Sequence, residues 1–168
     1  MLSERRRRDG RVRELLRTSE AMETLDARDR ALASRLALGA TSAEGTLDEV
    51  LKRYVKRPSS LEPRVRDALR LATFEALDLD TPASSVVSQG VELARHASPR
   101  AAGLANAVLR KVVAEARPQV AEARLRVEEG GADPADLALV AGLPRWLVTR
   151  VLEARGGRGR PLACALAA

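Results

Sequence analysis

The chain has 168 residues, of which 45% are hydrophobic and 31% are charged, and its formal net charge is +6. This balance is typical of a globular protein and argues against disorder throughout, while the positive charge favours anionic partners. Cys164 is the only cysteine, which excludes an internal disulfide and a zinc site of the usual spacing and fits a reducing cytoplasm. No apolar run reaches the roughly 18 residues of a transmembrane helix, and no signal peptide is recognisable, so we expect neither a membrane nor a metal as partner.

The hydrophobic pattern predicts an all-α fold, because apolar residues recur at intervals of three and four and no stretch alternates as a strand does. A first short helix is expected over residues 12–19, and a second is expected to end near Gly39 or Gly45. Thr46 and Glu49 have the spacing of a capping box, which predicts that a third helix starts there. The predicted inner face of this helix comprises Leu47, Val50, Leu51 and Tyr54.

Prolines mark the later helices, because a proline at the first helical position loses no needed hydrogen bond. Helices are expected to begin near Pro63, Pro82, Pro99, Pro134 and Pro144. Arg117 and Pro118 are expected to break the helix that begins near residue 99. The segment EEGGADP, residues 128–134, predicts a flexible turn before the next short helix.

Several segments in a fixed order carry a resemblance to a known family: DRALASRLALGA, GTLDEVLKRYVKRP, LEPRVRDALRLATFEALDLDTP and VELARHASPRAAGLANAVLRKV. Together they resemble the NusB-like helical domain. A further segment, LPRWLVTRVLEA at residues 143–154, resembles the helix that follows this domain in the RsmB (Sun) family of ribosomal RNA 5-methylcytosine methyltransferases. The chain departs from the usual family pattern at Ser88, Gln89, Gly90, Leu104 and Ala105.

The resemblance implies a compact helical bundle of two small helical subdomains, followed by a short helical extension. We expect residues 1–117 to form the NusB-like domain. Residues 118–168 are expected to form a helical linker or the start of a methyltransferase region that this chain lacks. In the family, catalysis belongs to that later domain, which binds S-adenosylmethionine and supplies a nucleophilic cysteine. No cofactor is expected in this chain, because no segment has the order strand, glycine-rich turn, helix.

Three polar or reactive residues are expected to be structural, so no catalytic residue is predicted. Cys164 lies in an apolar tail with no base near it in the sequence. We therefore expect it to behave as a small apolar residue. His96 is expected near a helix end, in contact with the terminal carbonyls. Asn106 shares a helical stripe with apolar residues, so we expect a buried amide that bonds to the backbone of an adjacent helix and fixes its register.

Basic residues form two candidate RNA-binding sets. The first is the arginine-rich amino end, with Arg5, Arg6, Arg7, Arg8, Arg11 and Arg13. The second is Lys52, Arg53, Lys56 and Arg57, whose spacing places them opposite the inner face of the third helix. Guanidinium groups match phosphate oxygens bidentately, and the resemblance to NusB proteins also suggests RNA binding at the amino end. A solvated tail and a membrane-surface patch are the alternatives for the first set.

The sequence therefore predicts a cytoplasmic RNA-binding domain, with ribosomal RNA as the expected partner, that holds RNA for a catalytic domain outside this chain. The scarcity of aromatic residues predicts that phosphate contacts dominate over base stacking. One alternative is a free-standing NusB-type transcription antitermination factor that pairs with a ribosomal protein, although the chain continues well beyond the segment NAVLR. Another is a helical bundle that binds a protein partner and no RNA.

Overall fold

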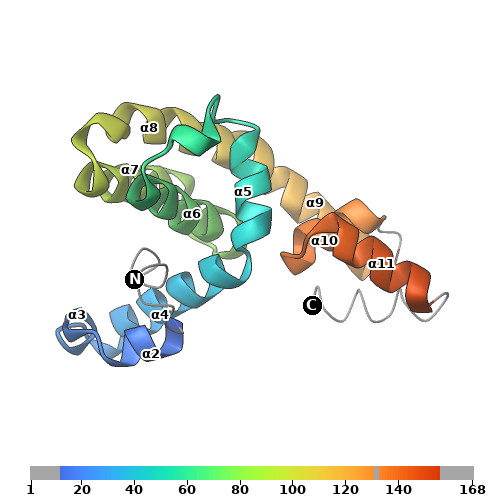
Figure 1. Ribbon diagram of the computed structural model, residues 1–168, viewed down its shortest axis with the longest axis horizontal. Helices are drawn as coiled ribbons and strands as arrows, with labels where there is room; N and C mark the ends of the chain where they lie inside the picture. Colours follow the sequence, from blue (N-terminus) through green and yellow to red (C-terminus); the bar gives the residue numbers. More distant parts are fainter. Residues whose placement is uncertain (1–11, 131–132, 156–168) are drawn as a thin grey trace.

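The computed structural model describes residues 12–130 and 133–155, and every regular element in these ranges is a helix (Figure 1). The predicted all-α fold is confirmed for this part of the chain. The first α-helices are α2 (Val12–Arg17), α3 (Glu20–Glu23), α4 (Ala27–Ser42), α5 (Glu44–Lys52), α6 (Pro63–Asp78) and α7 (Ala83–Ala97). The later ones are α8 (Ala102–Lys111), α9 (Arg117–Glu128), α10 (Pro134–Ala141) and α11 (Arg145–Arg155). The 3-10 helices η1 (Pro58–Ser60) and η2 (Pro99–Ala101) and the π-helical η3 (Val112–Ala116) connect them. Among the described helices, none has the length and apolar character that crossing a bilayer requires.

The helix starts predicted from prolines agree closely with the structure. α6 and α10 begin at Pro63 and Pro134, and α7 and α11 begin one residue after the expected prolines. Pro99 opens η2, and α8 follows three residues later. At α10 the cap is complete: Asp133 Oδ1 accepts hydrogen bonds from the amides of Ala135 and Asp136 at 2.7 and 2.8 Å. The fixed backbone angle of proline and a carboxylate cap therefore suffice to place this helix start.

The predicted capping box at Thr46 and Glu49 is wrong, because α5 begins at Glu44 and Thr46 lies inside its first turn. A single residue, Ala43, joins α4 to α5. Its amide donates to Gly39 O at 2.9 Å, and its carbonyl accepts from Leu47 N at 2.9 Å. These backbone groups are satisfied without a side-chain cap, and Glu49 instead pairs with Lys52.

The predicted helix break at Arg117 and Pro118 is also wrong, since α8, η3 and α9 follow one another without interruption (Figure 1). Pro118 has no amide to donate, and in a regular α-helix its ring would clash with the carbonyl four residues earlier. The π-helical turn before it widens the backbone spiral, and the Arg117 amide bonds to Val112 O, five residues back. The expected division of the chain at residue 117 stays a prediction.

The main hydrophobic core surrounds α6, which contacts α4, α5, α7, α8 and α9. Leu69 and Ala76 of α6 and Leu109 of α8 are fully buried in it. Close packing of α7 on its neighbours depends on Gly90, where a Cβ atom would lie 2.4 Å from Leu109 Cδ1 and 2.7 Å from Ala72 Cβ. The absence of a side chain at residue 90 thus lets three helices meet.

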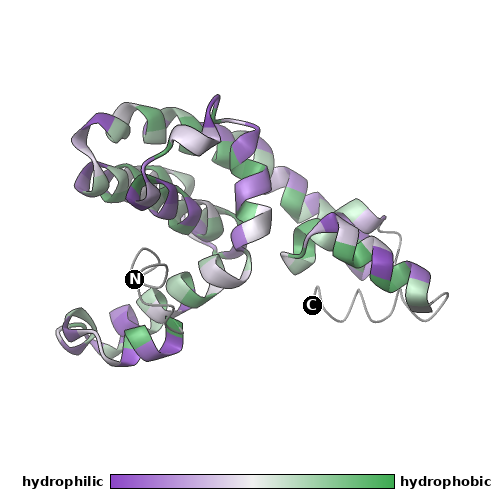
Figure 2. Cartoon of the chain, viewed as in Figure 1, coloured by the Kyte–Doolittle hydropathy of each residue, from purple (hydrophilic) through white to green (hydrophobic). Residues whose placement is uncertain are grey.

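Two smaller apolar clusters flank this core at opposite ends of the molecule (Figure 1). One joins α2, α3 and α4 through Val12, Leu16, Met22 and Ala37. The other joins α9, α10 and α11 through Val127, Leu137, Ala138 and Val148. Hydrophobic and hydrophilic residues alternate along the helices of both end clusters, as expected for helices with one buried face (Figure 2).

Candidate nucleic-acid interface

A buried ion network fixes α5 on α6. The Arg70 side chain is 4% exposed, and its guanidinium forms a two-pronged contact with Asp48, with Nε to Oδ1 at 2.7 Å and Nη2 to Oδ2 at 2.5 Å. Its Nη1 lies 2.6 Å from Glu44 Oε1 and 3.4 Å from Asp67 Oδ1. Burial opposes the charge on Arg70, yet the hydrogen bond and charge of Asp48, followed by the charges of Glu44 and Asp67, raise the pKa of Arg70 above its ordinary value. Because Glu44 and Asp48 belong to α5, the network holds this helix in one orientation.

The last residue of α5 and the turn that follows it present four cations to solvent, which we call the basic turn: Lys52, Arg53, Lys56 and Arg57. Val55, in the middle of the turn, is buried in the main core, and its amide donates to Leu51 O at 3.0 Å. With Val55 anchored inward, the flanking cations project outward, as the spacing predicted. The inner face is confirmed as well: Leu47, Val50 and Leu51 are buried, and Tyr54 is half-buried.

The segment after the basic turn is held by another arginine. Arg66 Nη2 donates to the carbonyls of Pro58 and Leu61 at 3.3 and 3.2 Å. A shallow depression of about 250 Å³ lies between this segment and α5, lined in part by Lys52, Ser59 and Arg66. The turn is therefore supported from both sides, by Val55 and by Arg66.

Two cations of the basic turn have partners that a phosphate can replace. Lys52 pairs with Glu49 at the surface, and the hydrogen bond and charge of Glu49 raise the pKa of Lys52. Arg53 Nη1 donates to Gln119 Oε1 at 3.0 Å, and the neutral amide leaves the charge of Arg53 uncompensated. Exposed pairs of this kind contribute little free energy, so exchange for a phosphate oxygen costs little.

Other arginines are occupied by structural contacts. Arg117 donates to the carbonyls of Thr81 and Leu79 at 3.0 and 3.4 Å, where the chain leaves α6. Arg124 donates to Leu77 O at 2.8 Å and pairs with Asp78 at 2.5 Å. These bonds satisfy carbonyls at the end of α6 and attach α9 to it, so these guanidiniums are not available to a ligand.

The amino-terminal arginine set lies almost wholly outside the described residues, which include Arg13 but not Arg5, Arg6, Arg7, Arg8 or Arg11. Arg13 is exposed on α2. In Figure 1, α2 lies at the lower left and the segment that follows α5 lies at the top, so the fold does not bring Arg13 next to the basic turn. Arg13 and the basic turn would therefore contact separate parts of a ligand.

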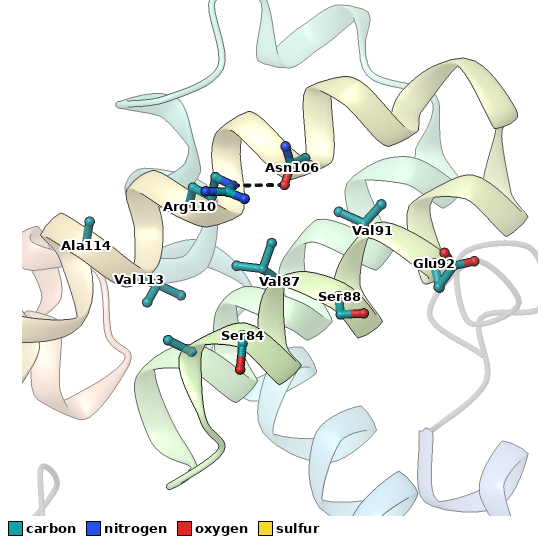
Figure 3. Close-up of a pocket in the computed structure, with 10 residues that line it drawn as sticks. Ser84, Val87, Ser88, Val91, Glu92, Asn106, Arg110, Val113 and Ala114 are labelled. Carbon is teal, nitrogen blue, oxygen red and sulfur yellow. Dashed lines mark hydrogen bonds between the residues drawn. The ribbon is translucent and has the colours of Figure 1, made fainter.

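Asn106 differs from its prediction: it is exposed, and its Oδ1 accepts from Arg110 Nε on the same helix at 3.2 Å. The predicted burial and bond to an adjacent helix are wrong, because α8 has one buried face, formed by Ala105, Val108 and Leu109, and Asn106 lies off it. Asn106 lines an open groove of about 670 Å³ between α7 and α8 (Figure 3). Valines and serines of α7 line the opposite wall.

Within the described ranges, no cluster of His, Cys, Asp and Glu could hold a metal ion. His96 is exposed in the last turn of α7, and its contact with terminal carbonyls stays a prediction. Cys164 lies outside the described residues. The described helices also provide no strand-to-helix turn of the kind that binds a nucleotide-type cofactor.

Sequence reasoning missed one exposed aromatic residue, Trp146, whose exposed fraction is 67%. A signal for it was present. Val148 and Leu152 are four residues apart and form the inward stripe of α11, so a residue two positions before Val148 must point away from the core. The spacing of the apolar residues therefore predicts that Trp146 lies on the outer face of α11.

Comparison with known proteins places this geometry in a family. The model of the NusB family matches residues 3–114. Ribosomal RNA small subunit methyltransferase B of Thermus thermophilus is 38% identical over 112 residues, which cover 67% of this chain and 28% of that protein. The protein of the same name from Xanthomonas campestris pv. campestris is 39% identical over 101 residues, which cover 58% of this chain and 23% of that protein.

A relative in Mycobacterium tuberculosis, whose name classes it provisionally as a methyltransferase, is 32% identical over 151 residues. This match covers 88% of the present chain and 32% of the relative. The chain thus spans less than a third of each of these proteins. No solved structure is significantly similar to it. Since the family model covers well over half of the chain, in agreement with the all-α architecture, this protein belongs to the NusB family.

Proposed function

We propose that this chain is the RNA-binding, non-catalytic portion of a ribosomal RNA cytosine-5 methyltransferase. The observation that carries the proposal is the basic turn, in which four cations face solvent at and just after the end of α5, a helix that Arg70 fixes to the core. A rigid array of cations binds phosphates with less loss of conformational entropy than a flexible one. On this proposal, methyl transfer and S-adenosylmethionine binding belong to regions that this chain does not span.

The length of the sequence matches favours this function over a free-standing antitermination factor. The NusB family model ends at residue 114, whereas the mycobacterial relative matches 151 residues of this chain. The similarity therefore extends into the region of α9, α10 and α11. These helices have their own apolar cluster and are attached to α6 through Arg124. A partner role with a ribosomal protein has no corresponding support, and a cytoplasmic location follows from the proposed substrate.

The proposal predicts RNA binding that depends strongly on salt. If the basic turn neutralises four phosphates of single-stranded RNA, a slope of about 0.7 per contact gives a loss of about fifty-fold in affinity between 50 and 200 mM salt. Removing two contacts with the variant K56Q/R57Q should lower the slope by about 1.4. Fluorescence anisotropy of a labelled ribosomal RNA fragment over a salt series measures both quantities.

The matched control is R95Q/R100Q, which removes the same charge at exposed positions in α7 and η2. If both double variants weaken binding equally, net charge and not the basic turn accounts for affinity. Equal RNA affinity after Arg5, Arg6, Arg7 and Arg8 are all changed to Ala would identify the amino-terminal set as a solvated tail. Methyl transfer to cytosine by this chain alone would contradict its non-catalytic assignment.

A further inference from the structure

The tryptophan at the start of α11 is exposed to a degree that needs an explanation. Trp146 is the only tryptophan of the chain, and two thirds of its surface is exposed, although the same helix contributes Val148 to a buried cluster. Large aromatic side chains bury most of their surface in folded proteins, and exposed ones are enriched at binding sites. The indole of Trp146 also makes no ring contact within the described residues.

The surroundings of Trp146 are cationic. Arg150 follows one helical turn later, which places it beside Trp146 on the outer face of α11, and Arg145 precedes Trp146 directly. Both arginines are exposed, and neither has an ion-pair partner among the described residues. Within this end cluster, by contrast, Arg126 is engaged by Asp136 at 2.7 Å. An open aromatic face between two available guanidiniums is complementary to a base with a phosphate on either side.

The backbone that carries Trp146 is also held in a defined place. Pro144 O accepts from the amides of Leu147 and Val148 at 2.9 and 3.3 Å, which fixes the first turn of α11. Val148 is 3% exposed, packed on the opposite side of the helix from Trp146. A ring on a fixed helix binds a base with a smaller ordering cost than a ring on a flexible segment, and aromatic platforms bind bases in this way in single-strand binding proteins.

We propose that Trp146 stacks on an unpaired base of RNA while Arg145 and Arg150 contact the adjacent phosphates. This inference rests on the proposed RNA-binding function and adds to it a second contact region, on α11, that selects single-stranded over fully paired RNA. Paired bases are stacked within their helix and expose no face, whereas an unpaired base offers one to the indole.

The test uses the tryptophan itself, because all indole emission of this chain comes from Trp146. The whole chain is titrated at low salt with an oligouridylate of about 12 nucleotides, a length within the range of single-strand sites. Inorganic polyphosphate is titrated in parallel as a probe with charge but no bases. We expect the oligouridylate to quench the emission and polyphosphate to leave it nearly unchanged.

Variants then measure the contribution to affinity by anisotropy of the labelled oligouridylate. W146L should weaken binding at least about fivefold, the lower end for one base stacked on an aromatic ring, and W146F should retain much of the affinity. R150Q should lower the salt slope by about 0.7. The matched control is L125A, which truncates another exposed apolar side chain, on α9, and should bind like the parent chain. Far-UV circular dichroism confirms that each variant is folded.

Three results would overturn the inference while leaving the proposed function intact: RNA binding without quenching, equal quenching by polyphosphate, or W146L binding as tightly as the parent. In each of them the salt-dependent contribution of the basic turn persists. Absence of any RNA binding in the anisotropy assay would instead remove the proposed function and this inference together.

Discussion

Replacing Arg70 with methionine tests whether the buried network holds the basic turn in place. Methionine has a similar length and no charge, so R70M removes the guanidinium that the carboxylates of Glu44, Asp48 and Asp67 all contact. Repulsion and lost hydrogen bonds should loosen α5 from α6. The basic turn is the continuation of α5, and its geometry should loosen with it.

The expected loss in the free energy of unfolding of R70M follows from how far the three acidic side chains are exposed. Breaking a fully buried pair costs about 3 to 5 kcal/mol, because one charge is left without a partner in a region of low dielectric constant. Here the Asp67 side chain is 7% exposed, whereas those of Asp48 and Glu44 are about one third exposed and regain water. We therefore expect R70M to lower the free energy of unfolding by about 3 kcal/mol, at the lower end of that range. R70K keeps the charge but loses the two-pronged contact, so it should lose less.

Urea unfolding followed by circular dichroism measures these losses. Adding D48L to R70M should recover part of the stability, since it removes one of the three negative charges that Arg70 contacts and replaces it by an apolar group. A loss below about 1 kcal/mol, typical of an exposed pair, would refute the role of Arg70 in fixing α5.

Two further predictions concern packing and pH. G90A should lower the free energy of unfolding by about 1 to 3 kcal/mol, because the new Cβ would lie 2.7 Å from Ala72 Cβ, which cannot move independently of α6. G103A, in open space on α8, should be neutral or slightly stabilising in the same urea assay, and equal effects of the two would contradict the packing argument. The hydrogen bond from Arg126 lowers the pKa of Asp136 in the folded state below its value in the unfolded chain. The Asp136 carboxylate therefore stabilises the fold at a pH above its unfolded pKa, and this stabilisation is lost as the pH falls through its folded pKa. D136N should therefore unfold at a lower urea concentration than the parent at pH 7, and the difference should disappear in strong acid; a difference that persists there would refute the assignment.

Much of the fold was predictable because its determinants are local in sequence. Proline fixes its own backbone angle wherever it occurs, so Pro63 and Pro134 mark helix starts without reference to the rest of the chain. The three-and-four spacing of Leu47, Val50 and Leu51 likewise gave the inner face of α5, and with it the outward direction of the basic turn. Both signals need only the residues of one helix.

The errors arose where a tertiary contact or a neighbouring element decided the outcome. Pro118 continues a helix because the π-helical turn before it removes the clash, and buried residues on both sides, Val112 and Val120, keep that helix on the core. Asn106 was assigned to the interior because both faces of α8 are rich in small apolar residues. Only one face has a helix against it, and the other lines the groove beside α7.

Arginine shows most clearly where sequence reasoning reaches its limit in this protein. The same side chain closes a buried network at position 70, bonds to carbonyls at positions 66, 117 and 124, and faces solvent in the basic turn. Composition counts all of these as positive charge, yet a guanidinium already bonded to carbonyls or carboxylates releases no counterions when RNA binds. The net charge of +6 therefore says little about the strength of RNA binding. The proposed RNA affinity depends instead on which cations the fold leaves available, and in the described residues these include Lys56 and Arg57 of the basic turn and the arginines beside Trp146.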